Sequence, residues 1–118
     1  MTKSIPPHYS PCVKLGNLIF TSGQLPLLKR EKKAAPETIE EQTLLCLQKI
    51  EALIAAHGLT KNDVLKTTAF ISNIEDWGAV NQVYADFFGE HKPARSIIPV
   101  KKLNYGCMIE IEGIAGKE

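Results

Sequence analysis

The sequence predicts an α+β fold in which two helices cover one face of a mixed β-sheet. Two amphipathic helical patterns, each followed by a glycine, alternate with short runs rich in β-branched and aromatic residues. The chain order that results is β-β-α-β-α-β-β, an arrangement that packs helices against a sheet. With 118 residues, the chain has the length of one domain, so we expect a single domain over residues 1–118.

The first two strands are expected to form a hairpin over residues 13–15 and 18–22. The dipeptide Gly16-Asn17 between them suits a two-residue turn that needs positive φ. Residues 23–26 then end the second strand, and a loop leads to the first helix.

The first helix is expected to begin after Thr38 and to run to about His57. Thr38 and Glu41 match a capping box, in which each side chain accepts a hydrogen bond from the other residue's backbone N–H. Gly58 suits the position just after the helix, where the backbone turns left-handed. The face expected to pack inward consists of Ile39, Thr43, Cys46, Leu47, Ile50, Leu53 and Ile54.

The remaining elements follow from the same patterns. A strand rich in β-branched residues is expected over residues 64–72, and two more over 95–100 and 107–115. A second helix is expected over residues 75–88, closed by Gly89. Its buried stripe is expected to consist of Trp77, Val80, Tyr84, Phe87 and Phe88.

Several of these strands are apolar on both faces, as at residues 18–20, 70–71 and 97–98. Two helices cover only one face of the sheet, so the other face needs a partner. A second copy of the same chain is the simplest one. The sequence therefore predicts a homo-oligomer.

Charge and composition exclude several functional classes. The 14 Lys and Arg nearly cancel 13 Asp and Glu, which argues against nucleic acid or an anionic membrane as a partner. The basic residues at 29–33 contain a glutamate and no aromatic residue, so we interpret them as the solvated tip of a loop. No apolar run would span a membrane, and the first residues lack a signal-peptide core. Three widely spaced cysteines indicate reduced thiols in a cytoplasmic protein, with no metal-ligand spacing.

Arg95 is the first candidate for a functional residue. It follows Pro93 and heads a strand that is otherwise apolar, where a guanidinium needs an anion. That anion is either Glu110 or Glu112, in a structural ion pair, or the carboxylate of a ligand held by the planar guanidinium. Both interpretations remain open at this point.

Other polar residues have a structural and a functional interpretation as well. Alternation along the last strand places Glu110 and Glu112 on one face, where they are either solvated or able to position water. Residues 21–24 form either a simple turn or a polar lip in which Ser22 and Gly23 approach a ligand. Tyr9 and Asn81 are single residues that act either as structural groups or as ligand contacts.

Four segments together resemble the Rid family of reactive-intermediate deaminases, also called the YjgF/YER057c/UK114 group. The resemblance extends from about Tyr9 to Ala115, and the Pro-Ala-Arg-Ser string before an Ile-Glu-Ile-Glu strand is its most specific part. The segments are residues 21–26, 80–84, 87–96 and 109–115.

The resemblance implies a chorismate-mutase-like fold and a homotrimer in which the sheets form an inner barrel. It also implies sites between subunits and the hydrolysis of 2-imino acids such as 2-aminoacrylate to 2-keto acids and ammonia, without a metal or organic cofactor. A non-catalytic trimer that binds 2-keto acids is an alternative. A ribonuclease or translation inhibitor is a further one, disfavoured by the near-neutral charge.

The resemblance also assigns roles to individual residues of this chain. Arg95 would bind the substrate carboxylate, and Glu110 would position the attacking water. The common cysteine two positions after this arginine is replaced here by Ile97, whose backbone N–H remains available. This replacement leaves the reaction class in place and bears on the substrate range. The remaining substrate contacts implied are Tyr9, Ser22, Gly23 and Asn81.

Overall fold

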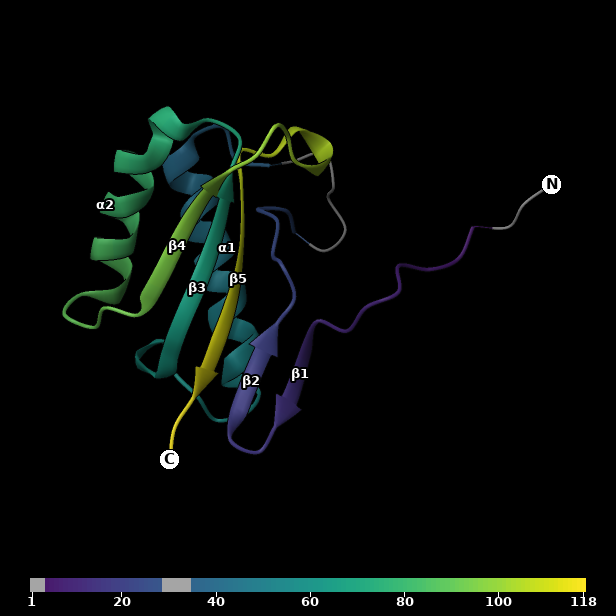
Figure 1. Cartoon of the computed structure of the whole chain (residues 1–118), viewed down its shortest axis with the longest axis vertical. Helices are drawn as coiled ribbons and strands as arrows, with labels where there is room; N and C mark the ends of the chain where they lie inside the picture. The colour runs from purple at the N-terminus through teal and green to yellow at the C-terminus, as the bar shows by residue number, and fades with distance from the viewer. Residues whose placement is uncertain (1–3, 29–34) are drawn as a thin grey trace.

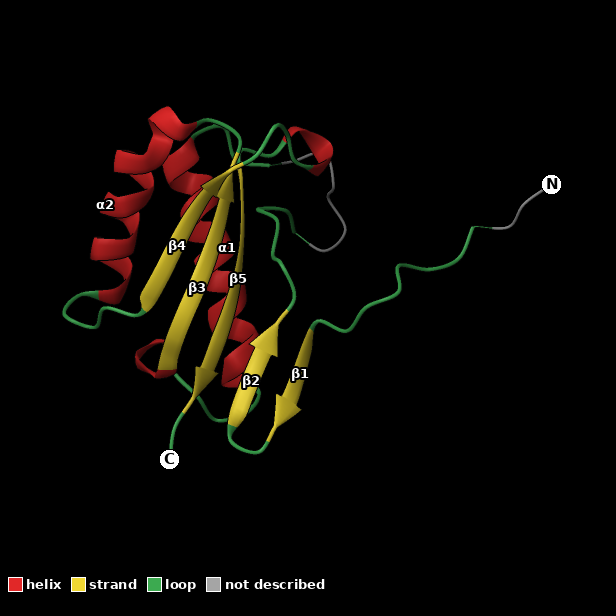
Figure 2. Ribbon diagram, in the orientation of Figure 1, coloured by secondary structure: helices red, strands yellow, loops and turns green. Residues whose placement is uncertain are grey.

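The structure is a computed structural model that describes residues 4–28 and 35–118. The basic residues expected at a loop tip, 29–33, therefore lie outside the described residues. The element order is the one predicted from the sequence (Figures 1 and 2). The elements are β1 (Cys12–Leu15), β2 (Leu18–Thr21), α1 (Ile39–Ala55), β3 (Val64–Ile71), α2 (Trp77–Phe88), β4 (Ala94–Pro99) and β5 (Ile109–Gly116).

The strands form one mixed sheet in the order β1-β2-β5-β3-β4. Strands β3 and β4 are parallel, and the other neighbours are antiparallel. The predicted hairpin is present, because Leu15 pairs with Leu18 across a turn in which Gly16 has a φ of 59°. Strand β4, which carries Arg95, is the edge strand farthest from this hairpin (Figure 1).

Both helices lie on one face of the sheet, as predicted (Figure 2). Their inward side chains and the side chains of that sheet face form one buried hydrophobic cluster. The central strands β3 and β5 contribute alternate residues to this cluster, as the period of two along a strand requires, and β2 contributes Ile19. Its best-covered members include Ile19, Ala69, Ile71, Ile109 and Ile111 from the sheet and Leu47, Ile54 and Val80 from the helices.

Helix α1 begins at the predicted capping box. The Oγ1 of Thr38 accepts a hydrogen bond from the Glu41 N–H at 3.1 Å, and the Thr38 N–H donates to the Glu41 carboxylate. The helix ends at Ala55, earlier than His57, and Gly58 takes the left-handed conformation with a φ of 76°. Positive φ is the reason that a glycine ends the helix here.

A buried glutamine on α1 was not predicted, because its amide interrupts the apolar pattern. Gln42 is only 3 % exposed and uses both ends of the amide. Its Nε2 donates to the Pro36 carbonyl at 2.7 Å, and its Oε1 accepts from the Met108 N–H at 2.8 Å. These two bonds satisfy the buried amide and join α1 to the start of β5.

Helix α2 differs from the prediction in its start and in one buried residue. Residues 74–76 form a 3₁₀ turn, and the α-helix begins at Trp77. Val80, Tyr84 and Phe88 are buried as expected. Trp77 was predicted to be buried and is 45 % exposed, because it lies at the first turn, where its ring faces the edge strand beside Arg95. Phe87, also expected in the stripe, is only partly buried.

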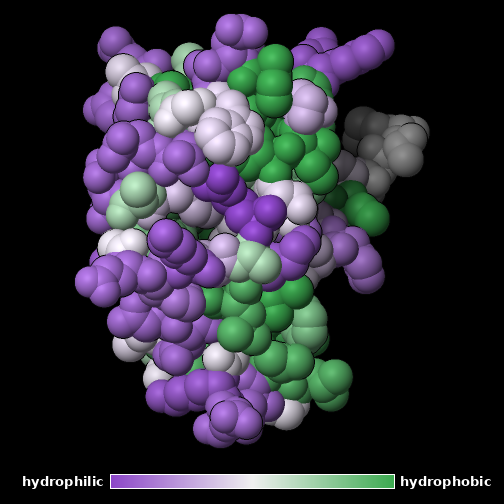
Figure 3. Space-filling view, turned by 60° about the vertical axis from the view of Figure 1, so that its left-hand side comes forward, coloured by the Kyte–Doolittle hydropathy of each residue, from purple (hydrophilic) through white to green (hydrophobic). Residues whose placement is uncertain are grey.

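The sheet face away from the helices carries exposed apolar side chains, as the sequence predicts. Leu18 is 36 % exposed, Phe20 is 38 % exposed and Ile98 is 41 % exposed. Val13 and Leu15 extend this surface onto β1. A band of hydrophobic surface runs along the molecule beside a largely polar surface (Figure 3). No helix in the described part of the chain is long and apolar enough to cross a membrane.

Candidate active site

Arg95 is held by aromatic rings and not by a carboxylate. Its backbone is in register with Thr67, whose side chain is buried beneath the helices, so the Arg95 side chain points to the helix side of the sheet. The guanidinium carbon lies 4.9 Å from the ring centre of Tyr84 and 5.3 Å from that of Trp77. Such cation–π contacts stabilise the charge without neutralising it. Within residues 4–28 and 35–118, no carboxylate forms an ion pair with this guanidinium.

The ring of Tyr84, which supports this guanidinium, is held in place by burial and by a hydrogen bond. The side chain is 5 % exposed, and its hydroxyl is 2.8 Å from the Oγ1 of Thr67. Burial raises the pKa of Tyr84 to about 12, so the hydroxyl is protonated at neutral pH. A neutral phenol does not neutralise Arg95, and the guanidinium keeps its full charge for a ligand.

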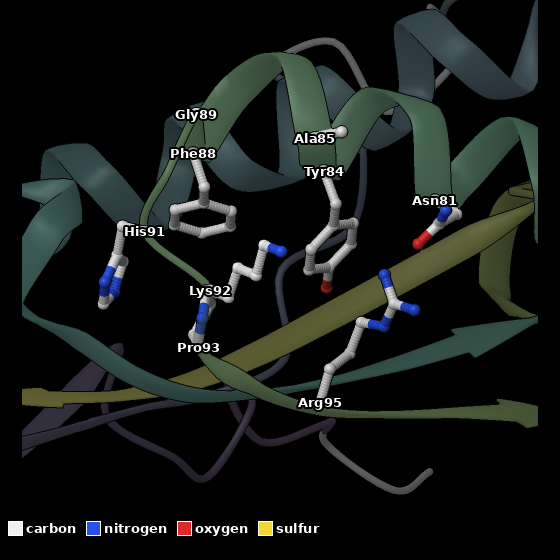
Figure 4. Close-up of a pocket in the computed structure, with 9 residues that line it drawn as sticks. All are labelled: Asn81, Tyr84, Ala85, Phe88, Gly89, His91, Lys92, Pro93 and Arg95. Atoms are coloured by element: carbon white, nitrogen blue, oxygen red, sulfur yellow. The ribbon is translucent and has the colours of Figure 1, made fainter.

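A pocket of about 470 Å³ opens between α2 and β4 beside this arginine (Figure 4). The Arg95 side chain extends into it from β4, and the Asn81 amide extends into it from α2 toward the guanidinium (Figure 4). The size is that of a small-molecule site. The lining residues are Asn81, Tyr84, Ala85, Phe88, Gly89, His91, Lys92, Pro93 and Arg95.

The two glutamates of β5 lie on the other face of the sheet. Glu110 pairs with Phe70 and Glu112 with Thr68, whereas Arg95 is in register with the helix-facing Thr67. Alternation along the strands therefore places both carboxylates opposite to the guanidinium. A structural ion pair between Arg95 and either glutamate, one of the two interpretations from the sequence, does not form.

The environment of Glu110 disfavours its ionised form. The side chain is half-buried, and burial raises the pKa of its carboxyl, with a further upward contribution from the negative charge of Glu112. A carboxyl with a raised pKa can exchange protons closer to neutral pH than an ordinary one.

Gly23 lies directly against the Glu110 carboxylate. A Cβ atom added at Gly23 would overlap the Glu110 Oε2. The next residue fixes this approach, because Gln24 exchanges two backbone hydrogen bonds with Ile111, at 2.7 Å and 3.1 Å. Glycine is therefore needed here for space, and not for an unusual φ.

Ser22 uses its polar groups to hold the segment that carries Tyr9. Its hydroxyl donates to the Ser10 carbonyl at 2.6 Å, and its N–H donates to the Pro11 carbonyl at 2.9 Å. Tyr9, the residue before Ser10, is 67 % exposed. The segment before β1 extends away from the sheet (Figure 1). The serine thus acts within one chain as an anchor for this segment.

The predicted site residues form two groups within one chain. Arg95, Asn81 and Ile97 lie where β4 faces α2, with Ile97 packed against the core. The second group gathers where β2 ends against β5. Its members are Glu110, Gly23, Ser22 and, through Ser10, Tyr9. The structure brings Arg95 together with Asn81 at the pocket, brings Gly23 against Glu110, and keeps these two pairs apart. Ile97 does not line the pocket, and the hydrogen bond of Ser22 reaches the residue next to Tyr9.

Three residues at or beside the pocket were not identified as site residues from the sequence: Tyr84 and Lys92 line it, and Trp77 contacts the Arg95 guanidinium. Trp77 and Tyr84 were assigned only to the hydrophobic stripe of the helix, and Lys92 was not singled out. Helical spacing contains the missing signal, because Trp77, Asn81 and Tyr84 are separated by four and three positions and therefore share one face.

The described residues contain no group of three or more His, Cys, Asp and Glu side chains arranged to hold a metal ion. Cys46 and Cys107 are buried free thiols, and Cys12 is partly exposed. Burial raises the pKa of Cys46 and Cys107, which keeps both as thiols.

Comparison with known proteins identifies the relatives of this chain. A model of the Endoribonuclease L-PSP family matches residues 2–117. A RutC family protein of Pyrococcus horikoshii is 40 % identical over 110 residues, which cover 93 % of this chain and 87 % of the relative. The 2-iminobutanoate/2-iminopropanoate deaminase of Escherichia coli K12 is 38 % identical over 120 residues, covering 97 % and 93 %.

Solved structures agree with these relatives. The YjgF gene product of E. coli superposes with a TM-score of 0.88 at 38 % identity, covering 95 % of this chain and 90 % of that one. E. coli TdcF with bound serine gives a TM-score of 0.87 at 36 % identity, covering 98 % and 91 %. The likeness confirms the chorismate-mutase-like α+β fold that the resemblance implied. This chain therefore belongs to the Endoribonuclease L-PSP family, the YjgF/Rid group that its sequence resembles.

Proposed function

We propose that this protein hydrolyses reactive 2-imino acids, such as 2-aminoacrylate in its imine form, to 2-keto acids and ammonia. The observation that carries the proposal is the Arg95 guanidinium, which reaches into a pocket without a carboxylate partner among the described residues. A guanidinium of this kind suits the planar carboxylate that every 2-imino acid carries. The similarity to the E. coli 2-iminobutanoate/2-iminopropanoate deaminase supports the same reaction.

The residues of the two groups divide the reaction between them. Arg95 binds the substrate carboxylate and thereby fixes the position of the adjacent C=N carbon. Glu110 holds a water molecule against that carbon. The water oxygen forms a bond to the carbon, the nitrogen takes up protons, and the C–N bond breaks to release ammonia and the 2-keto acid. The raised pKa of Glu110 suits a carboxyl that accepts a proton from water and returns it.

This division requires a second copy of the chain. Arg95 and Glu110 lie on opposite faces of the sheet, so one chain does not present both to a single small substrate. The exposed apolar face provides the surface on which copies would associate. We infer a homotrimer in which Arg95 of one subunit and Glu110 of a neighbour share a cleft, with the sheets forming an inner barrel.

The direct test uses 2-aminoacrylate produced in situ by a serine dehydratase. Added protein should accelerate pyruvate release above the rate in buffer, and protein with Arg95→Ala should not. Pyruvate release at the buffer rate would contradict the proposal. Binding of 2-oxobutanoate without any acceleration would instead favour a non-catalytic 2-keto-acid-binding protein, in which Arg95 retains its carboxylate contact.

A further inference from the structure

The pocket beside Arg95 contains a second cation. Lys92 lines the pocket on the loop that leads into β4, and its side chain extends toward α2, between Phe88 and Tyr84 in the view of Figure 4. Its amino group and the Arg95 guanidinium therefore both enter the space between β4 and α2 (Figure 4). None of the nine lining residues is acidic.

Two other polar groups of the pocket, those of His91 and Tyr84, already have partners. The His91 Nε2 donates to the Val64 carbonyl at 2.7 Å, and the Tyr84 hydroxyl is paired with Thr67. Lys92, like Arg95, has no ion-pair partner in the part of the chain that the structure describes. The pocket thus offers two cations to a ligand, and the Asn81 amide besides.

We propose that Lys92 binds a second carboxylate, so that the pocket prefers 2-imino acids derived from dicarboxylic amino acids. The proposal rests on the proposed function. One carboxylate, present in every 2-imino acid, satisfies Arg95 and leaves the Lys92 ammonium unpaired. The imines come from amino acids, whose anionic side chains are the carboxylates of aspartate and glutamate. Lys92 is therefore a specificity-determining residue for the distal end of the substrate.

The kinetic test compares two substrates that differ only at that end. D-aspartate oxidase produces 2-iminoglutarate from D-glutamate, and D-amino-acid oxidase produces 2-iminopentanoate from D-norvaline. The readout is the ratio of the two kcat/KM values, measured by competition with semicarbazide for the imine. Lys92→Met should lower the dicarboxylate preference about fivefold, the size expected of a partly exposed ion pair. Lys92→Arg should retain it.

A matched control separates the pocket from general charge. Lys117 is exposed near the C-terminus and outside the pocket, so Lys117→Met should leave the ratio unchanged. An unchanged ratio in Lys92→Met, or an equal fall in Lys117→Met, would overturn the proposal while the deaminase reaction stands.

A binding measurement keeps the proposal testable without turnover. Calorimetry with 2-oxoglutarate and 2-oxopentanoate should give tighter binding of the dicarboxylate to the wild-type protein, and Lys92→Met should remove most of the difference. This binding difference would support the role of Lys92 even if the protein hydrolysed no imine. The absence of hydrolysis would contradict only the proposed function. Equal affinities of the wild type for the two keto acids would overturn the role of Lys92.

Discussion

Gly23 leaves the space that the carboxylate of Glu110 occupies. A Cβ at this position would overlap the Glu110 Oε2, and the two hydrogen bonds between Gln24 and Ile111 prevent the loop from moving away. The position of the carboxylate is thus set by a residue without a side chain.

Gly23→Ala should therefore reduce deaminase activity without unfolding the protein. The added methyl group displaces the Glu110 carboxylate, and a misplacement of about 1 Å can lower a rate by about 100-fold. The measurement is kcat/KM on 2-iminobutanoate together with circular dichroism. Gly78→Ala is the matched control, because a Cβ there meets open space in a helix and should be neutral or stabilising by up to about 1 kcal/mol. Full activity in Gly23→Ala would show that the Glu110 position is unimportant.

Arg95→Lys should lose most of the activity although it retains the charge. A lysine ammonium does not reproduce the two parallel hydrogen bonds of a guanidinium or its stacking on Tyr84. Losing one charge-assisted hydrogen bond costs about 1.5–3 kcal/mol, so kcat/KM should fall roughly 10- to 150-fold. Activity within a factor of about two of the wild type would mean that Arg95 is not the carboxylate contact.

The acid limb of the pH–rate profile should report Glu110. Because its pKa is raised, the required carboxylate becomes protonated at a higher pH than an ordinary glutamate does. On acidification, kcat/KM should therefore begin to fall at a higher pH. Glu112→Gln removes the nearby negative charge and should move this limb to lower pH. The shift should be partial, since burial is the larger cause. Glu75→Gln is the control, because Glu75 is not among the causes of the raised Glu110 pKa, and an equal shift in that variant would refute the assignment.

Two inactive variants should restore activity when they assemble together. If a site takes Arg95 from one subunit and Glu110 from its neighbour, mixed oligomers of Arg95→Ala and Glu110→Gln contain some sites with both residues intact. Every mixed trimer then has one intact site out of three, so the isolated mixed oligomers should show about one third of the wild-type activity. Co-expression with two affinity tags isolates the mixed oligomers, and light scattering gives their subunit number. Mixed oligomers that remain inactive would exclude a shared site.

Tyr84→Phe should destabilise the protein more than its small change in volume suggests. The substitution leaves the Thr67 hydroxyl buried, at 1 % exposure, without its partner. An unsatisfied buried polar group costs about 1–3 kcal/mol. Urea unfolding at one fixed protein concentration measures the change. The double variant Tyr84→Phe with Thr67→Val should recover part of the loss, and a failure to recover would indicate that the hydrogen bond is not the cause.

The fold was predictable from the sequence because its signals are local. The capping box of Thr38 and Glu41, the turn at Gly16 and the alternation of β5 each depend on neighbouring residues, and the structure contains all three. The prediction that Trp77 is buried was wrong. Its hydrophobicity indicates burial, whereas its place at the first turn of α2 leaves it partly exposed.

The sequence indicated candidate residues for the site but not how the fold arranges them. Arg95 and Glu110 were identified together, but nothing local indicates that a sheet separates them. The registers of β3 with β4 and of β3 with β5 decide this, and they depend on contacts distant in sequence. Lys92 was not identified, because a lysine in a loop ordinarily indicates only a side chain exposed to solvent.

Burial divides the pocket wall into a fixed part and an adaptable part. Tyr84 and Phe88 face the pocket and also belong to the hydrophobic core, so a change at either would disturb folding. The exposed lining residues do not belong to the core, so changes there should not disturb folding. They are Asn81, Ala85 and Lys92. If this pocket is the substrate site, substitutions at these exposed positions would change what the pocket binds without disturbing the core that supports Arg95.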